Sequence, residues 1–352
     1  MATYIIRRLL LVPVLLFGVT LLIFSMLQFL SPMERASLYV RDIPKNDNAI
    51  NGIIKQYGLD QPLYVQYWHW LVGTTVNGER KGGILFGDFG YSRTASQSVA
   101  DLIRVRFPNT LDLTIWAVAP VILVGIWLGV QAAVHQNGFI DQAARVFSIV
   151  GTSFPTFVFG LLMLMIFYVK LGWFPPGRIS DWANIVVRSA DFHHYTSLLT
   201  FDSLLNGRLD IFWDVLRHML MPILTLSYIS WAQFLRVTRS SMLETLSMEY
   251  VTTARAKGLT EHDVIFKHAQ PNAMIPVVTL AGFSVILLLG GVVITETVFN
   301  FPGIGQAAAN AAAQLDVITV LGFALFNGFI LIVANLVVDV LYAVVDPRVR
   351  LS

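Results

Sequence analysis

The distribution of apolar residues constrains this chain more than any other feature of its sequence. Six runs of roughly 20 mostly apolar residues follow one another, each long enough to cross a hydrocarbon layer as a helix. Only 13% of the 352 residues are charged, about half the share in an ordinary soluble domain. The sequence therefore predicts an all-α polytopic membrane protein with about six transmembrane helices. The runs cover Leu9–Leu30, Leu111–Val134, Val146–Val169, Leu216–Leu235, Met274–Ile294 and Val317–Val338.

Five of the six runs contain a proline, which removes a backbone hydrogen bond and bends a helix. Bent spans suit a protein with an internal path, but they are also common in membrane helices that line no path. Both interpretations therefore stay open on this feature. The prolines are Pro13, Pro120, Pro155, Pro222 and Pro276.

Basic residues predict the orientation, because cytoplasmic flanks of membrane helices carry an excess of lysine and arginine. Arg7 and Arg8 precede the first run, and Arg348 and Arg350 follow the last one. We therefore expect both termini in the cytoplasm. The expected domains are residues 1–30 as cytoplasmic tail and first span, 31–106 as a small external loop domain, and 107–352 as a five-span core.

The expected external domain carries its own helical and turn signals. Ile50, Ile53, Ile54 and Tyr57 recur at helical spacing until Gly58 ends the pattern. The aromatic stretch LYVQYWHWL follows, and such residues favour the boundary between membrane and water. The segment GGILFGDFGYS then indicates turns around short extended pieces. These signals predict a small cap lying on the outer membrane surface.

The segment YVTTARAKGLTEHDVIFKHAQPNAMIPV, Tyr250–Val277, is polar and basic between two apolar runs. Its pattern predicts a helix that ends at Gly258, where glycine accepts a left-handed cap. Thr260 and Asp263 then form the capping box of a second helix, which Pro271 ends before the fifth run. Small residues at the corner let another surface approach. The segment is either a knob for a cytoplasmic partner or a loop packed on itself.

The search for catalytic and metal motifs is mostly negative. The sequence contains no phosphate-binding G-x-x-x-x-G-K-[ST], no H-E-x-x-H and no G-x-S-x-G, and it has no cysteine. His193 and His194 are adjacent on a polar loop, where a solvated pair is more common than a metal site. No run carries the carboxylate or histidine relay that a proton-coupled carrier or a membrane enzyme needs. The net charge of +2 gives no indication of nucleic-acid binding.

A few polar or small residues inside the runs need an explanation. Asp112, Glu296 and Asp339 lie near the ends of runs, where packing through hydrogen bonds is the simpler reading. Gly125-x-x-x-Gly129 in the second run lets another helix approach closely. The candidates for lining a path are Thr152, Ser153, Phe154 and Ser284; packing and local capping are equally good explanations for them.

The segment TTARAKGL, followed by HAQPNAMIPV, resembles the cytoplasmic coupling motif of ABC importer permeases, whose general form is E-A-A-x-x-x-G-x9-I-x-L-P. Gly258 stands at the glycine of that motif, and His268 to Pro271 close it. The resemblance implies that the loop 236–272 couples the permease to ATPase subunits. The residues it marks for that contact are Thr252, Thr253, Ala254, Arg255, Ala256, Lys257, Gly258, Leu259 and Pro271.

Further pieces of the chain are similar to the dipeptide, oligopeptide and nickel branch of these permeases. They are YIIRRLLLVPVLLFGVTLLIF, YGLDQPLYVQY, GDFGYS, RFPNTLDL, RHMLMPILTL, ETVFNFPGIGQ and VDVLYAVVDPRVR, in that order along the chain. Two pieces depart from the branch: SPMERAS replaces P-G-D-P after the first run, and the outer segment Arg178–Asp214 is longer than usual. Both departures leave the solute open among peptides, oligosaccharides and nickel.

The resemblance implies the type I importer architecture and a multi-subunit complex. Its expected members are a second, homologous permease subunit, two ABC ATPase subunits that hold ATP and Mg, and an extracytoplasmic solute-binding protein. This chain itself would bind no cofactor or metal and would hold no catalytic residue. It would lie in the lipid bilayer of a bacterial or archaeal cell membrane. The alternative is a stand-alone carrier or channel, which would transport solute without ATP.

Overall fold

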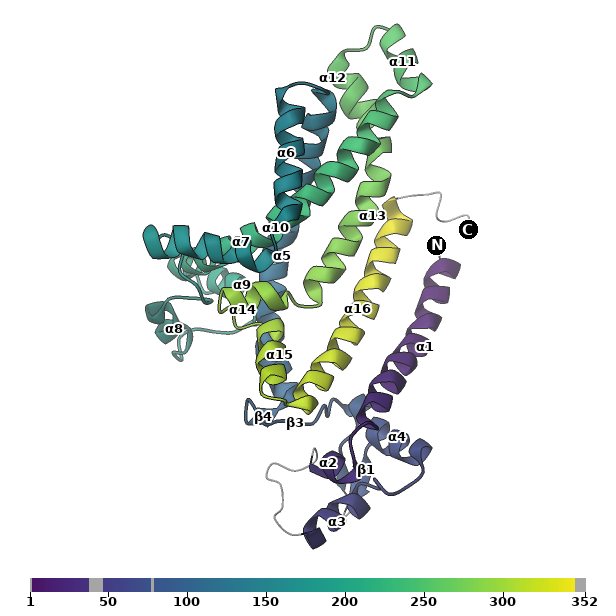
Figure 1. Cartoon of the computed structure of the whole chain (residues 1–352), viewed down its shortest axis with the longest axis vertical. Coiled ribbons are helices and arrows are strands. Elements are labelled where there is room, and N and C mark those ends of the chain that lie inside the picture. Colours follow the sequence, from purple (N-terminus) through teal and green to yellow (C-terminus); the bar gives the residue numbers. More distant parts are fainter. Residues whose placement is uncertain (1, 38–46, 77–78, 346–352) are drawn as a thin grey trace. The chain divides into compact units, whose positions relative to one another are not determined.

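The computed structural model describes residues 2–37, 47–76 and 79–345, and these are mostly helical (Figure 1). The predicted all-α fold is therefore confirmed. The chain packs as two compact units, Met1–Pro108 with Gly303–Ser352, and Asn109–Pro302. This division by packing runs across the expected functional domains, which concern membrane sides and remain predictions. Arg348 and Arg350, used to predict the orientation, lie outside the described residues.

The first unit combines a small cap with helices from both ends of the chain. Two short antiparallel hairpins, β1 with β2 and β3 with β4, are its sheet elements, with Thr74 opposite Lys81 and Tyr91 opposite Ser98. The helix α5 (Val99–Val134) begins in this unit and continues into the second. The other elements are α1 (Ala2–Leu27), α2 (Pro32–Ser37), α3 (Asp47–Gln56), α4 (Leu63–Val72), β1 (Thr74–Val76), β2 (Glu79–Lys81), η1 (Ile84–Phe86), β3 (Tyr91–Ser92), β4 (Gln97–Ser98), α15 (Ile304–Ala313) and α16 (Val317–Val345).

Two apolar helices, α1 and α16, lie side by side in this unit (Figure 1). A Cβ atom added to Gly328 of α16 would lie 2.9 Å from Cγ1 of Val19, so the two backbones are close. Near the ends of the helices, Arg8 Nε lies 3.1 Å from a carboxylate oxygen of Asp339. Asp339 is thus an ion-paired packing residue, as the simpler reading of the sequence expects.

The cap has the helices that its sequence predicts. Ile50 and Leu59 form its small core together with Ala36, and Tyr57 packs against them. In α4, the Tyr67 hydroxyl is hydrogen-bonded to Thr20 Oγ1 of α1 at 2.8 Å, which ties the aromatic stretch to the first span. The predicted turns of GGILFGDFGYS are also present, as η1 and the first strand of a hairpin.

The second unit is built around one long helix, α10 (Leu209–Leu246), which carries buried residues from Ile211 to Thr245. Its main neighbours are α13, α6, α9 and α7. The remaining elements are α6 (Phe139–Ser153), α7 (Thr156–Met163), the π-helix η2 (Leu164–Lys170), α8 (Asp181–Val187), α9 (Leu199–Leu205), α11 (Glu249–Ala256), α12 (Glu261–Asp263), the π-helix η3 (Val264–Ala269), α13 (Gln270–Leu289) and α14 (Val293–Val298).

The pair Gly125 and Gly129 lets α5 and α10 pack closely. A Cβ atom at Gly125 would lie 2.5 Å from Cβ of Phe234, and one at Gly129 would lie 2.4 Å from Cβ of Thr238. Distances below 3 Å leave no room for a side chain. The small-residue spacing in the second run therefore does permit the close helix approach that the sequence analysis considers.

Four helices among the described residues are long and apolar enough to cross a membrane, and a bent pair makes up to five. The expected third span, Val146–Val169, is that pair: α6 ends at Ser153, α7 begins at Thr156, and their axes differ by 103°. The bend that the sequence predicts beside Pro155 is thus a complete break between two helices. Phe154 and Pro155 are both extended, with ψ of 125° and 141°. For Phe154 the reason is that the residue before a proline avoids the helical region.

The fourth expected run, Leu216–Leu235, lies inside α10, which is not among the described helices that are apolar enough to count as candidate spans. Its polar residues are buried: His218, Thr225 and Ser227 have side chains within the unit. A helix enclosed by other helices contacts little lipid, so polar positions along it are tolerated where neighbours surround them. Enclosure of α10 therefore explains why its sequence gives the weakest signal of the six.

Candidate functional site

The segment that the sequence singles out forms a short helix, a corner and a second helix. α11 begins after Met248, which is extended, and carries Glu249 in its first turn, where a negative charge favours the helix dipole. It ends at Ala256, and the Gly258 N–H donates to Arg255 O at 2.9 Å. Figure 1 shows α11 and α12 at the tip of the second unit, beyond the ends of α10 and α13.

The geometry of the corner agrees with its sequence signals. Gly258 has φ of +79°, a conformation that residues with a side chain rarely adopt. Thr260 is the N-cap of α12, and its Oγ1 accepts the Asp263 N–H at 3.2 Å. The predicted glycine cap and threonine cap are therefore confirmed.

The expected end of the second helix at Pro271 was wrong. Helix continues from Glu261 to Leu289, and η3 gives it wider π turns just before the proline. Proline has no N–H and crowds the carbonyl one turn earlier, so a straight α-helix is disfavoured at this point. The π turns, together with a bond from Asn272 Nδ2 to His268 O at 2.9 Å, carry the helix past Pro271.

The inner face of the corner packs on the segment itself. Val251 and Ala254 of α11 are buried against Val264 and Ala269 of η3. Ala254 is thus the one residue of the expected contact set that faces inward. Its small side chain lets the two short helices lie close together, so it positions the corner.

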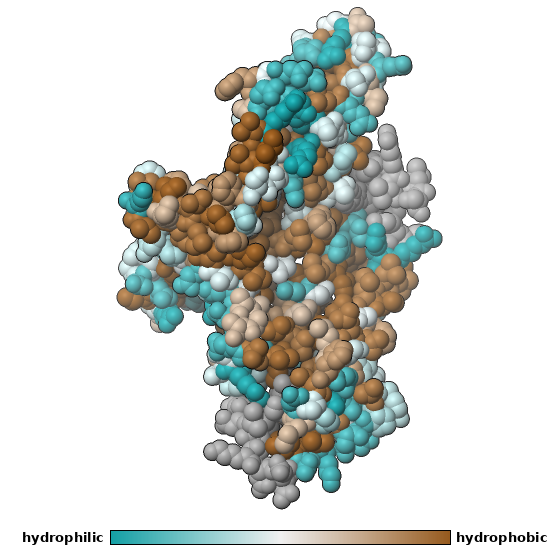
Figure 2. All heavy atoms as spheres, viewed as in Figure 1, coloured by the Kyte–Doolittle hydropathy of each residue, from teal (hydrophilic) through white to brown (hydrophobic). Residues whose placement is uncertain are grey.

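The outer face is open, and it includes every other residue of the expected contact set. Two large apolar side chains, Tyr250 (43%) and Phe266 (41%), are exposed beside them, and Leu259 of the set is itself 40% exposed. A Cβ atom at Gly258 would meet no atom of this chain within 4 Å. Figure 2 shows hydrophilic residues gathered over this tip, with some apolar atoms among them. Such a mixed and convex surface suits contact with another protein.

Two ion pairs brace the corner. Arg255 Nη2 lies 2.7 Å from Glu261 Oε1, across Gly258, and this bond raises the pKa of the Arg255 guanidinium. Lys267 Nζ lies 2.7 Å from Asp263 Oδ1 one turn earlier on the second helix. Because all four groups reach solvent, each pair contributes little to stability. Lys257 remains exposed beside them.

The candidate path residues lie in two places in the second unit. Thr152, Ser153 and Phe154 are exposed at the break between α6 and α7. The Thr152 and Ser153 hydroxyls donate to carbonyls of their own helix, at 3.0 Å to Ser148 O and 2.7 Å to Ile149 O. Ser284, on α13, likewise donates to Leu280 O at 2.9 Å. Each of these hydroxyls already has a hydrogen-bond acceptor in its own helix. This agrees equally well with a role in packing and capping and with a place along a path.

A buried ion cluster that the sequence analysis did not anticipate joins α6 to α10. Asp141 is fully buried. Arg239 forms two hydrogen bonds to its carboxylate, from Nε to Oδ1 at 2.6 Å and from Nη2 to Oδ2 at 3.0 Å. Arg145 adds a bond from Nη2 to Oδ2 at 2.9 Å, and the Asn137 N–H donates at 3.0 Å. The carboxylate is therefore fully paired. Its only sequence signal is an acid beside the third apolar run.

A second buried cluster anchors the outer segment between α7 and α10. The Thr200 hydroxyl donates to Asp112 Oδ1 at 2.5 Å, and Trp116 Nε1 donates to Thr200 Oγ1 at 3.1 Å. Arg178 Nη2 lies 3.8 Å from Asp112 Oδ2, and burial lowers the pKa of Arg178 to about 10. The charges of this segment are thus partly paired inside the unit.

Other polar residues noted in the sequence also have packing partners. Glu296 is fully buried and accepts the Thr110 hydroxyl at 2.8 Å. His194 Nδ1 lies 3.7 Å from the buried Asp202, and the His193 N–H donates to Asn206. Within the described ranges, no group of three or more His, Asp or Glu side chains is arranged to hold a metal ion.

Comparison with known proteins gives a consistent result along the chain. Residues 122–351 match the family model described as binding-protein-dependent transport system inner membrane component, and residues 1–114 match the N-terminal model of the same kind of protein. The probable D,D-dipeptide transport system permease protein DdpB of Escherichia coli K12 is 37% identical, over 94% of this chain and 93% of its own length.

Two more relatives are similar over essentially their full length. The oligopeptide transport system permease protein AppB of Bacillus subtilis is 34% identical, over 99% of this chain and 100% of its own. The di/tripeptide transport system permease protein DppB of Pseudomonas aeruginosa is 36% identical, over 99% of each chain. The helical fold, the apolar spans and these matches agree. The chain belongs to the family of binding-protein-dependent transport system inner membrane components.

Proposed function

We propose that the chain is a transmembrane subunit of an ATP-driven importer of peptides. The observation that carries this proposal is similarity over the full length of permeases named for dipeptides, oligopeptides and di/tripeptides. The similarity covers nearly the whole chain, the outer loop included, and the relatives are named for peptides, which favours peptides over oligosaccharides or nickel. The chain would form the path across the membrane together with a second, homologous permease subunit.

The corner at Gly258 is the proposed contact with the ATPase subunits. Its support is the open outer face, where Arg255, Ala256, Lys257 and Leu259 surround a glycine with free space around it. The inner face is filled by the segment's own residues, so the corner keeps its shape without a partner. The pair of short helices α11 and α12 is held rigid by its own packing and connects α10 to α13. It can therefore transmit the movement of a partner to these two long helices.

The remaining parts of the complex follow from the family. Two ABC ATPase subunits would bind ATP and Mg on the cytoplasmic side, and an extracytoplasmic binding protein would deliver the solute. ATP binding and hydrolysis would alternate the complex between two states that differ in their contacts with the knob. This chain would contribute the path and the coupling surface, and its partners would contribute the chemistry.

Solute-stimulated ATP hydrolysis tests the solute class. The complete complex, reconstituted with its binding protein, is assayed with a panel of di- to pentapeptides, oligosaccharides and Ni²⁺. We expect stimulation by peptides, because a loaded binding protein favours the state in which the ATPase subunits close. Stimulation by an oligosaccharide or Ni²⁺ alone would replace peptides as the solute and leave the coupling proposal in place.

Cysteine labelling tests the orientation and the path, since the chain has no cysteine of its own. With cytoplasmic termini, a cysteine at Asn206 is labelled in intact cells, and one at Lys257 only after permeabilisation. The reverse result would overturn the orientation.

The same cysteine-free background tests the path. Cysteines placed at Thr152, Ser153, Phe154 and Ser284 should react with aqueous thiol reagents to an extent that depends on solute or nucleotide. Uniform protection at these four sites would remove them from the path.

A further inference from the structure

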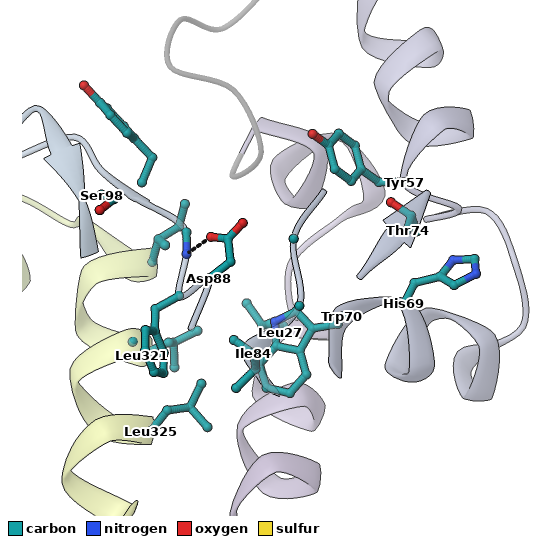
Figure 3. A pocket seen from close by; sticks show the side chains of 17 residues that line it. Leu27, Tyr57, His69, Trp70, Thr74, Ile84, Asp88, Ser98, Leu321 and Leu325 are labelled. Atoms are coloured by element: carbon teal, nitrogen blue, oxygen red, sulfur yellow. Dashed lines mark hydrogen bonds between the residues drawn. The ribbon is translucent and has the colours of Figure 1, made fainter. Parts of the chain in front are cut away.

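The first unit contains a cavity of about 470 Å³ that the proposed mechanism does not use (Figure 3). It is formed by the end of α1, the cap around α4, the turn Gly82–Gly90 and the start of α16. This size falls within the range of small-molecule binding sites. All of these segments lie within one compact unit.

Most of the cavity wall is apolar or aromatic. Leu27 and Trp70 line it on one side, and Leu321 and Leu325 of α16 line it on the other. In Figure 3 these side chains point into the same space, with Ile84 between them. The leucines belong to the ends of membrane helices, so the floor of the cavity suits a hydrocarbon group.

The polar side of the cavity is centred on Asp88. Figure 3 shows its carboxylate projecting between α16 and the cap, with the Tyr57 side chain on the facing side. Asp88 Oδ1 accepts the Gly90 N–H at 2.9 Å, which fixes the carboxylate while its second oxygen still faces the cavity. Burial, and to a smaller extent the charge of Asp88, raises the pKa of Tyr57.

Among the described side chains that line the cavity, the one formally charged group at pH 7 is a carboxylate, and His69 adds an imidazole. Among the 17 lining residues drawn in Figure 3, Asp88 is the only one with a carboxylate, and none is a lysine or arginine. Thr74 Oγ1 is buried in the same wall and has no hydrogen-bond partner among the described residues. A negative charge attracts a cation, and Trp70 in the same wall is the kind of ring that cations favour. Asp88 is itself exposed at the mouth, where a cation can reach it from water.

We propose that this cavity binds a primary ammonium group carried on an apolar body, with the ammonium at Asp88 and the body against Trp70, Leu321 and Leu325. Two natural molecules share this chemistry. One is the amino terminus of a short peptide with an apolar first side chain, and this version rests on the proposed function. The other is an aminophospholipid of the surrounding membrane, which does not depend on that function.

Calorimetric titration of the full-length chain in nanodiscs made only of phosphatidylglycerol tests the shared chemistry. The probes are the dipeptide Leu-Leu and its N-acetylated form, which lacks the ammonium. We expect Leu-Leu to bind at least tenfold more tightly than the acetylated form. Asp88→Asn, whose side-chain oxygen still accepts the Gly90 N–H, should weaken Leu-Leu binding at least tenfold. Asp60→Asn, which removes an exposed acid of the same cap outside the cavity wall, is the control and should have no effect.

The source of the ammonium is distinguished by native mass spectrometry in bilayers that contain phosphatidylethanolamine. Retention of this lipid by the wild type and its loss in Asp88→Asn would identify the lipid as the occupant. Equal binding of both dipeptide forms, or unchanged binding of dipeptide and lipid by Asp88→Asn, would overturn the proposal. So would a wild-type chain that binds neither. Because the assay needs neither ATP nor partners, its failure is separate from a failure of peptide import.

Discussion

Replacing Gly258 by valine should abolish solute uptake while the subunit still accumulates in the membrane. Valine at φ of +79° costs about 1–2 kcal/mol in the backbone, and its side chain also projects into space that this chain leaves empty. Because the corner is remote from the packing of the long helices, insertion should be normal. The expected loss is of solute-stimulated ATP hydrolysis, or of the ATPase subunits on purification, measured at matched membrane levels.

Two control variants separate backbone strain from contact with a partner. Asparagine tolerates the left-handed conformation, so Gly258→Asn adds a side chain at the corner with little strain. Gly207→Val applies similar strain elsewhere, because Gly207 has φ of +67° and equally free surroundings. If the corner docks on an ATPase, Gly258→Asn impairs uptake and Gly207→Val retains the ATPase subunits. Normal uptake and subunit retention in Gly258→Val would mean that the segment is an ordinary loop.

Removing the guanidinium of Arg239 should be the most destabilising change in the second unit. Arg239→Met leaves the buried carboxylate of Asp141 without its shortest bond, at 2.6 Å, and without a second bond at 3.0 Å, and such a loss costs on the order of 3 kcal/mol. Arg145 still contacts the carboxylate, but its side chain is 44% exposed against 19% for Arg239. We therefore expect Arg145→Met to cost clearly less.

Thermal unfolding in detergent measures this difference. Arg239→Met should lower the midpoint by several degrees more than Arg145→Met. Adding Asp141→Leu to Arg239→Met should recover part of the loss, because no buried charge is then left unpaired. Equal midpoints for the two single variants would show that the buried ion pair of Arg239 contributes no more to stability than the more exposed ion pair of Arg145.

The corner could be predicted from sequence because its determinants are local. Gly258 and Thr260 act on the backbone within three residues, so their types alone indicate a left-handed cap and an N-cap. The outcome at two prolines depended on more distant contacts. Pro155 breaks its helix by 103°, whereas the helix passes through Pro271 by widening into π turns. The sequence marks both prolines alike, and the surrounding packing decides between a break and a bulge.

The buried ion clusters could not be predicted for a different reason. Asp141 and Arg239 are 98 residues apart, and Asp112 and Arg178 are 66 apart, so nothing in either neighbourhood indicates the partner. A charged residue beside an apolar run is a reliable sign that a partner exists. Identifying that partner requires knowing which helices are neighbours. The same applies to Asp88, whose role depends on how α16 packs against the cap.

Uptake into proteoliposomes tests the central claim most directly. The chain is reconstituted with its homologous permease subunit, the two ATPase subunits and the binding protein, and accumulation of a labelled dipeptide is followed with and without ATP. Our account predicts uptake only when ATP reaches the side of the Gly258 corner and binding protein is present on the other. Accumulation by this chain alone, without ATP or partners, would contradict it and identify the protein as a stand-alone carrier.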